Sequence, residues 1–182
     1  MIAPSRSGWL LLVACALPIA ADVTNCACDA SKPVTMEARE CSLCREADKQ
    51  TGEVFFLKDN NPRKPNRWLA LPKDHGDAGH PLYKLPKAKQ AALWTAAITK
   101  AKELWGDEWG LAYNAQVHRT QCHGHIHIGK LLKGLAPGKF YDVSSVDQIL
   151  IPADNTGVWV HPVGSMLRVH TGEGITETVL LR

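Results

Sequence analysis

The strongest periodicity along the chain is helical. Between residues 87 and 105, apolar side chains recur at spacings of four, three and four residues, at Trp94, Ile98, Ala101 and Trp105. Such spacings place these side chains in one stripe along an α-helix. Pro86 suits the first turn of the helix and Gly106 suits its end. We therefore predict a helix over residues 87–105 that lies with its apolar stripe against a sheet.

Apolar runs rich in β-forming residues flank this helix on both sides. Two precede it, EVFFLK (53–58) and NRWLALP (66–72), and two follow it, WGLAYN (109–114) and CHGHIHIGKLL (122–132). Shorter runs come later, QILIP, GVWVHP, MLRVH and ITETVLL, at residues 148–152, 157–162, 166–170 and 175–181. Strands, one long helix and then more strands predict an α+β domain with a mainly antiparallel sheet and one long amphipathic helix packed on it.

The length of 182 residues suits one domain with a proper core. We divide the chain into four segments. We expect residues 1–21 to be a signal peptide, 22–52 a cysteine-bearing N-terminal arm, 53–136 the core of the domain, and 137–182 a C-terminal β extension. The role of the extension stays open between completing the sheet, covering a cleft and forming a separate β unit.

The first residues are typical of a targeting signal. Arg6 precedes an apolar run from Trp9 to Ala21, which is shorter than the roughly 20 residues of a membrane-spanning helix. We predict export to the periplasm or the medium, with cleavage after Ala21. The alternative is a lipoprotein signal with Cys15 acylated, which the short apolar stretch before that residue makes the weaker interpretation.

Cleavage after Ala21 leaves five cysteines, Cys26, Cys28, Cys41, Cys44 and Cys122. The first four lie within nineteen residues. In an exported protein this pattern predicts disulfides, and four cysteines allow three pairings that the sequence does not separate. The competing prediction is a zinc site, because CSLC is also a chelating spacing. We favour disulfides.

The charge and the tryptophan residues add little to the prediction of function. The net charge of +3 is mild and falls to +2 without Arg6, which excludes a general nucleic-acid binder. The basic run KDNNPRKPNR, residues 58–67, is interpreted as a solvated loop, with attraction of an anionic substrate as the alternative. Trp109 and Trp159 are assigned to packing, with a nucleobase or lipid pocket as the alternative.

Three of the eight histidines, His123, His125 and His127, occupy alternate positions. Alternate side chains of a strand share a face. We therefore expect the three imidazoles to point one way, toward solvent or a cleft, while Ile126 and Ile128 point toward the helix.

Such a row has three interpretations: a polar strand face without a role, a metal site, or a site for phosphate chemistry. Hydrogen-bonding side chains lie just before the row, at Asn114, Arg119, Thr120 and Gln121. Donors beside one nucleophile suit a phosphate better than a closed metal site. The sequence therefore favours phosphate chemistry.

With these residues in view, HGHIHIG resembles the motif of the histidine-triad superfamily of nucleotide hydrolases and transferases. The wider order agrees over residues 53–132: RWLALPKDH, then the amphipathic helix, GLAYN and the histidine strand. RTQCHGHIHI together with VFFLKDNN is especially similar to the CDP-diacylglycerol pyrophosphatase branch. The resemblance implies a HIT-like fold and hydrolysis of a phosphoanhydride bond, with CDP-diacylglycerol cleaved to CMP and phosphatidate as one example.

The resemblance also implies roles for the three histidines. His125 matches the nucleophile that attacks the α-phosphate, giving a nucleotidyl-histidine that water hydrolyses, and this chemistry needs no cofactor. His123 and His127 match the partners that orient it and contact phosphate oxygens.

The neighbouring polar residues match substrate-binding positions. Asn114 and Thr120 match side chains that bind phosphate or the leaving group, and Arg119 and Gln121 match the pyrophosphatase branch. The implied partner is a nucleotide or nucleotide-lipid substrate near a membrane surface, and homodimers are common in this superfamily.

The metal expectation is none, with one alternative. Some members of the superfamily hold zinc with a set that here would be Cys41, Cys44, His75 and His123, as a structural ion. The alternative function is accordingly a non-catalytic zinc- or nucleotide-binding module.

Overall fold

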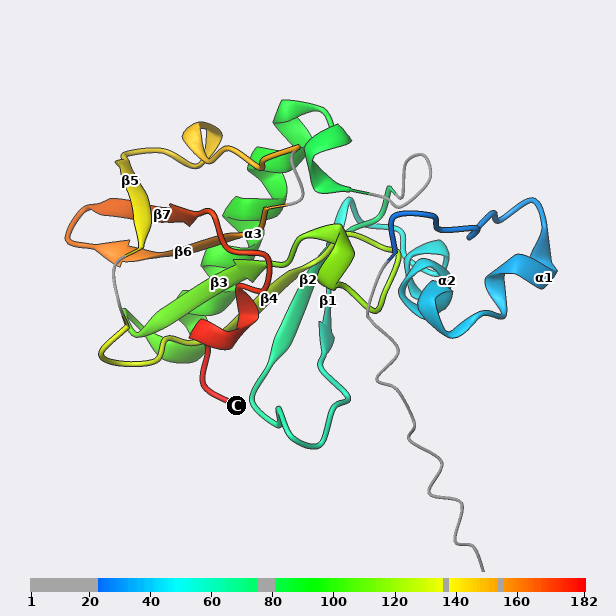
Figure 1. Ribbon diagram of the computed structural model, residues 1–182, viewed down its shortest axis with the longest axis horizontal. Helices are drawn as coiled ribbons and strands as arrows, with labels where there is room; N and C mark the ends of the chain where they lie inside the picture. Colours follow the sequence, from blue (N-terminus) through cyan, green and yellow to red (C-terminus); the bar gives the residue numbers. More distant parts are fainter. Residues whose placement is uncertain (1–22, 75–80, 136–137, 154–155) are drawn as a thin grey trace, which may run out of the picture.

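The computed structural model describes residues 23–74, 81–135, 138–153 and 156–182 (Figure 1). Its strands form one seven-stranded sheet in the order β1-β2-β4-β3-β6-β7-β5, and every pairing is antiparallel. The predicted α+β class with an antiparallel sheet is therefore confirmed. The expected signal peptide, with Cys15, and His75 and His80 lie outside the described residues.

The strands are short, at five or six residues each. In chain order they are β1 (Val54–Lys58), β2 (Trp68–Pro72), β3 (Trp109–Tyr113), β4 (Ile126–Lys130), β5 (Lys139–Val143), β6 (Val158–Val163) and β7 (Met166–Thr171). Because β6 pairs with β3, the C-terminal extension continues the same sheet and forms no separate unit.

Some strand predictions were wrong. Residues 148–152 form no strand, and residues 175–181 contain a 3₁₀ turn, Glu177–Val179, with one isolated bridge from Leu180 to Leu131. Edge strand β5 was not predicted, because mostly exposed residues give it little apolar alternation. The strand expected over 122–132 begins only at Ile126, since the Cys122 N–H bonds to the Glu40 carbonyl and not to a neighbouring strand.

The predicted helix is α3 (Lys87–Trp105), which packs on one face of the sheet. It buries Leu93, Trp94, Ala97, Ile98 and Ala101 against strand residues that include Ile126 and Ile128. Gly106 ends the helix at a φ of 55°, a conformation that side chains with a Cβ rarely adopt. The expected stripe and the expected direction of both isoleucines are confirmed.

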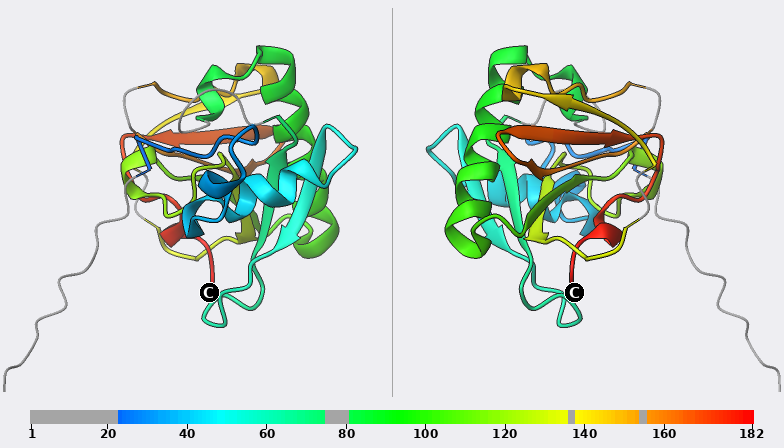
Figure 2. Two further views of the ribbon diagram at one scale, coloured as in Figure 1. Left: turned by 90° about the vertical axis from the view of Figure 1, so that its right-hand side faces the viewer. Right: turned by 90° about the vertical axis from the view of Figure 1, so that its left-hand side faces the viewer.

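The opposite face carries two other covers, as the side views show (Figure 2). Over β1 and β2 lies the N-terminal arm, with α1 (Pro33–Met36) and α2 (Ser42–Asp48). Over β3 and β4 lies a segment that we name the C-terminal segment, residues 174–182, drawn in red in Figure 1. This face holds the histidines.

A pair of glycines lets the C-terminal segment approach the sheet. Gly110 of β3 lies opposite Gly129 of β4. A Cβ at Gly110 would lie 2.6 Å from Cδ2 of Leu180, and one at Gly129 would lie 3.1 Å from Cδ of Arg67. Side chains at either position would push the segment away, so the glycines fix its path past the histidines.

Candidate functional site

The three histidines lie on the sheet face opposite α3. His127 is in β4, opposite Leu69 of β2 and Ala112 of β3. The His125 ring lies edge-on to that of His127, with centroids 4.8 Å apart. The His123 ring lies 6.5 Å from that of Phe55, a residue that packs under α2. The row thus stays on one side of the chain, although only His127 belongs to a strand.

The imidazoles do not line an open groove, contrary to expectation. His123 is fully buried, and His125 and His127 are only 6% and 7% exposed. The physical reason is the cover over this face: α2 packs above β1 and β2, and the C-terminal segment packs above β3 and β4. The three rings therefore lie largely out of contact with solvent, where polar groups interact more strongly than in water.

His123 acts as an anchor. Its Nε2 lies 2.8 Å from the carbonyl oxygen of Pro72, at the end of β2. Because a carbonyl only accepts, Nε2 carries the proton. This bond fixes the chain just before His125.

His125 is oriented by the backbone beside it. Its Nδ1 lies 2.8 Å from the His123 carbonyl oxygen, so Nδ1 carries the proton and Nε2 carries the lone pair. No group among the described residues hydrogen-bonds to Nε2, and this atom is not completely enclosed by the protein. Burial, followed by the nearby His127, lowers the pKa of His125 to about 3. The ring is therefore neutral at physiological pH, with an available lone pair.

His127 faces a carboxylate that the sequence did not single out. Its Nδ1 lies 3.6 Å from Oε2 of Glu177, in the C-terminal segment. Burial lowers the pKa of His127 to about 4, although Glu177 acts in the opposite direction. The carboxylate favours a proton on Nδ1, which leaves the lone pair on Nε2.

Glu177 is the centre of a charged cluster. It pairs with Lys64, and its Oε2 lies 3.2 Å from Nη1 of Arg67. Burial raises the pKa of Glu177, but His127, Lys64 and Arg67 outweigh it and hold the pKa at about 2. Arg67 is 1% exposed and donates from Nη2 and Nε to three carbonyls of the C-terminal segment, those of Glu177, Leu180 and Leu181.

The basic run therefore does not form only a solvated loop. Lys64 and Arg67 turn inward, while Arg63 is exposed. The spacing of the run gave no sign of this, because the carboxylate that binds both cations lies more than a hundred residues later.

Arg119 is buried beside the histidines. Its guanidinium carbon lies 5.5 Å from the centroid of the Tyr113 ring, and burial lowers its pKa. The charge of Arg119 also contributes to the lowered pKa of both His125 and His127. Of the four predicted substrate-binding residues, Arg119 is thus brought to the histidines.

Asn114 is buried, but its oxygen serves the fold. Oδ1 accepts hydrogen bonds from the backbone N–H groups of Thr176 at 2.8 Å and Glu177 at 3.0 Å. Asn114 therefore holds the start of the turn that brings Glu177 to His127.

Substitution of Asn114 tests this anchor. Asn114→Ala leaves two buried N–H groups without their acceptor, so we expect unfolding free energy to fall by about 1–3 kcal/mol. Urea unfolding followed by circular dichroism measures the change. The exposed Thr120→Ala is the matched control and should change stability by less than about 0.5 kcal/mol. Equal values for both variants would contradict the assigned role.

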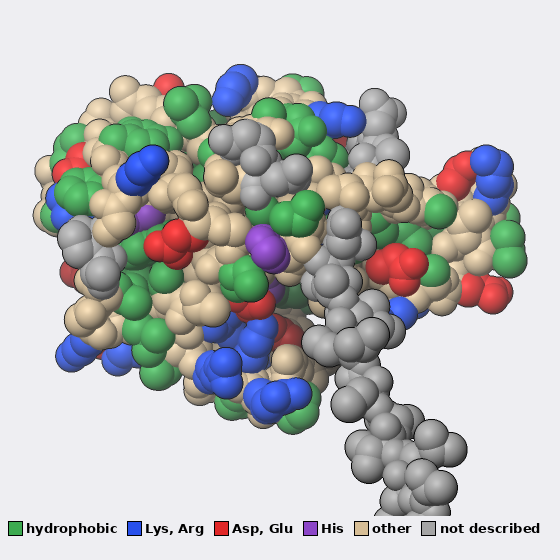
Figure 3. All heavy atoms as spheres, viewed as in Figure 1, with side chains coloured by type: hydrophobic (Ala, Val, Ile, Leu, Met, Phe, Trp, Pro, Cys, Tyr) green, Lys and Arg blue, Asp and Glu red, His purple; other side chains and the backbone are tan. Residues whose placement is uncertain are grey.

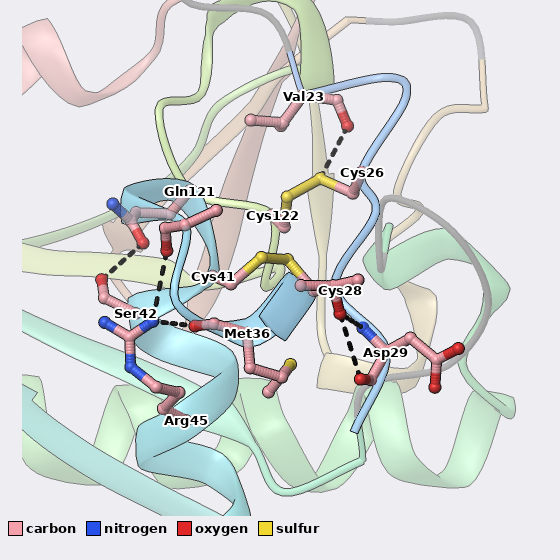
Figure 4. The surroundings of a disulfide bond; sticks show 12 residues. Val23, Cys26, Cys28, Asp29, Met36, Cys41, Ser42, Arg45, Gln121 and Cys122 are labelled. Atoms are coloured by element: carbon pink, nitrogen blue, oxygen red, sulfur yellow. Dashed lines mark hydrogen bonds between the residues drawn. A yellow bond between two sulfur atoms is a disulfide. The ribbon is translucent and has the colours of Figure 1, made fainter. Parts of the chain in front are cut away.

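The other two predicted binding residues lie elsewhere. Thr120 is exposed. Gln121 accepts at Oε1 from Ser42 Oγ at 2.7 Å and donates from Nε2 to the Arg39 carbonyl at 3.2 Å (Figure 4). Gln121 thus ties the loop before the histidines to the N-terminal arm.

Two disulfides reinforce this tie, as Figure 4 shows: Cys26–Cys122 and Cys28–Cys41. The prediction of disulfides is confirmed, but the expected grouping of four N-terminal cysteines was wrong. Cys122 takes part, and Cys44 is the free thiol among the described residues. Cys44 is buried, and burial raises its pKa to about 11, so it is a poor metal ligand or nucleophile.

The residues do not fit the alternative zinc set. Cys41 is bonded to Cys28, and Nε2 of His123 faces the Pro72 carbonyl. The sulfurs of Cys26, Cys28 and Cys122 do lie within 4.8 Å of one another, but all three belong to disulfides. A cysteine binds zinc as a thiolate, and the disulfides remove these thiolates.

Comparison with models of known protein families gives no match. Comparison with curated protein sequences gives none either. The function is therefore argued from the site alone.

Proposed function

We propose that this protein is an exported, HIT-like phosphohydrolase that cleaves a phosphoanhydride bond of a nucleotide-containing substrate through His125. The observation that carries the proposal is the hydrogen bond from His125 Nδ1 to the His123 carbonyl, which leaves the Nε2 lone pair in a nearly enclosed site. The two disulfides agree with an oxidising compartment. Within the described part of the chain, no helix has the length and hydrophobicity needed to cross a membrane.

In the first step, Nε2 of His125 attacks the α-phosphorus. The N–P bond forms as the P–O bond to the leaving phosphate breaks, and that oxygen departs with the bonding electrons. Positive charge develops on the imidazole, and the His123 carbonyl, which accepts from Nδ1 at 2.8 Å, stabilises it. Covalent catalysis thereby divides one difficult displacement into two easier ones.

In the second step, water attacks the same phosphorus and the N–P bond breaks, which restores the neutral His125. We assign His127 as the base that accepts the proton of this water at Nε2, because its Nδ1 side faces Glu177 at 3.6 Å. The imidazolium formed there is stabilised by the carboxylate. Glu177 is thus a positioning residue, which acts through His127.

The surrounding charge suits a substrate with several phosphate oxygens. Arg119 carries a buried positive charge next to both imidazoles, and a guanidinium fork matches phosphate geometry. Lys64 and Arg67, which pair with Glu177, add positive charge near His127. In Figure 3, Lys and Arg side chains gather where the loop between β1 and β2 lies, at the lower end of this face.

The substrate class is tested by a screen with purified protein. Its arms are dinucleoside polyphosphates, nucleoside phosphoramidates, and CDP-diacylglycerol in detergent micelles, with release of nucleoside monophosphate as the readout. The proposal predicts turnover of at least one phosphoanhydride without added metal and in the presence of EDTA. Absence of release from every arm would contradict the proposed function and favour a non-catalytic binding module.

The pH dependence of turnover tests the state of His125. Its ordinary pKa of 6.5 falls to about 3 on burial, so the neutral nucleophile persists down to about pH 4. We expect kcat/KM to change less than about twofold between pH 5 and pH 8. With the ordinary pKa, only about 3% of the ring would be neutral at pH 5, and the rate would fall about 30-fold. A fall of that size between pH 7 and pH 5 would contradict the structure of the site.

A further inference from the structure

A cavity of about 410 Å³ lies on the histidine face of the sheet, at the end away from α2. One wall consists of side chains from β6 and β7, Trp159, His161, Arg168 and His170, and the other of residues 131–135, with the carboxylate of Glu108 also in the lining. Its volume lies in the range of small-molecule sites. All residues that line the cavity belong to the part of the chain that the structure describes.

The cavity and the catalytic histidines are connected by the register of the sheet. His127 pairs with Ala112, Ala112 with Trp159, and Trp159 with His170. Trp159 therefore lies two strands from His127, about 10 Å away at the usual strand spacing. Val179 and Leu180 pack on Ala112 and Trp159 between the two positions, so the cavity is a separate site on the same face.

Three nearly parallel rings form the sheet-side wall. The Trp159 and His170 rings stack with centroids 3.4 Å apart at an angle of 7°. The His161 ring is tilted by 19° from Trp159 and by 26° from His170, with centroids 5.3 Å and 5.2 Å away. Of the three, His161 is the least buried. A flat molecule that enters the cavity therefore lies between this aromatic cluster on one side and leucines on the other.

Hydrogen bonds hold this wall in place. Nδ1 of His161 lies 3.1 Å from the Pro162 carbonyl and therefore carries a proton, which leaves the lone pair on Nε2. That nitrogen lies 3.2 Å from Nε2 of His170. Burial lowers the pKa of His161, so this ring is neutral and suited to stacking.

The cavity also offers positive charge. Arg168 donates from Nε and Nη2 to Asp142, which leaves Nη1 without a hydrogen-bond partner among the described residues. Lys133 stands at the rim, largely exposed, with only a distant ion pair of 3.8 Å to Glu108.

We propose that this cavity is a second ligand site, which binds a planar heteroaromatic ring that carries an anionic group, as a nucleoside monophosphate does. The ring stacks along the wall formed by Trp159, His161 and His170, and the anionic group meets Arg168 and Lys133. Binding there requires no turnover by His125, so the proposal goes beyond the proposed function.

Isothermal titration calorimetry with CMP and AMP tests the site. We expect a complex with wild-type protein, and at least tenfold weaker binding of cytidine, which lacks the phosphate, and of ribose 5-phosphate, which lacks the base. His161→Ala removes the least buried stacking ring and should weaken CMP binding about tenfold, because one stacked base contributes about 1–3 kcal/mol. Leu132→Trp fills the cavity and should do the same.

Two control variants locate the bound nucleotide. His118→Ala removes an exposed imidazole outside the cavity and should bind CMP as the wild type does, whereas His125→Ala removes the proposed nucleophile and reports whether CMP binds at the catalytic histidines instead. Thermal unfolding of each variant establishes that it is folded.

The proposal is overturned if CMP binds with unchanged affinity to both His161→Ala and Leu132→Trp, or if only His125→Ala weakens it. The second result would locate the nucleotide at the catalytic histidines and leave the proposed function intact. The same titration is carried out with Zn²⁺. Tight Zn²⁺ binding that His161→Ala abolishes, together with no binding of CMP, would identify a metal site between His161 and His170. This result would overturn the proposed nucleotide site.

Discussion

His125→Ala is expected to reduce kcat by at least about 10³-fold, while CMP still binds. The substitution removes the only atom that forms the proposed N–P bond, and loss of a nucleophile usually costs more than loss of an accessory residue. Among the described residues, the side chain makes one hydrogen bond, to the His123 carbonyl, so its loss unpairs no donor there. Steady-state turnover of the best phosphoanhydride in the substrate screen measures the effect.

His118→Ala is the matched control for this substitution. His118 also carries an imidazole and lies in the turn between β3 and β4, but it is exposed, beside Gly174. We expect its kcat to stay within about twofold of the wild-type value. Substantial activity in folded His125→Ala would remove the proposed nucleophile, whatever the control does.

Loss of the Cys26–Cys122 disulfide is expected to give the largest change in stability. This bond closes a sequence separation of 96 residues, whereas Cys28–Cys41 closes 13. In the loop-entropy model, a longer closed loop restricts the unfolded chain more, and removal of a native disulfide typically costs about 2–5 kcal/mol. We expect the Cys26→Ser/Cys122→Ser double variant to lose about 1–2 kcal/mol more than Cys28→Ser/Cys41→Ser.

Urea unfolding under non-reducing conditions compares the two double variants. Each replaces both partners, so neither creates a new thiol that reacts with Cys44. Cys122 directly precedes His123, so the Cys26→Ser/Cys122→Ser variant should also lose more turnover. The reverse order of stability would show that the constraint on the loop before the histidines matters less than packing within the arm.

The spacing of apolar residues predicted those elements whose conformation depends on residues close together in sequence. The stripe from Trp94 to Trp105 identified α3, and the alternation around Ile126 and Ile128 identified the face that packs against it. Residues 175–181 read as a strand because they are apolar and β-branched. The conformation of residues 175–181 depends instead on the packing of Leu180 onto Gly110 and Gly129. These residues are far apart in sequence, so the local pattern does not reveal the contact.

The site was predicted only where its residues are neighbours in sequence. His125, His127 and Arg119 lie within nine positions and come together in space. Glu177 was missed because a single acidic residue in a C-terminal run gives no signal, and its partners Lys64 and Arg67 lie in a distant loop. For the same reason, the burial of the histidines could not be predicted, because α2 and the C-terminal segment, which cover them, are both distant from them in sequence.

The covalent intermediate is the most direct test of the central claim. Protein is mixed with the phosphoanhydride substrate and quenched at alkaline pH within the first turnover, because phosphoramidates are labile in acid. Peptide mass spectrometry then locates the adduct. The proposed function predicts a nucleotidyl group on His125, absent from His125→Ala. A protein that turns over this substrate with the nucleotidyl group on another residue, or with no adduct at any time, would contradict it.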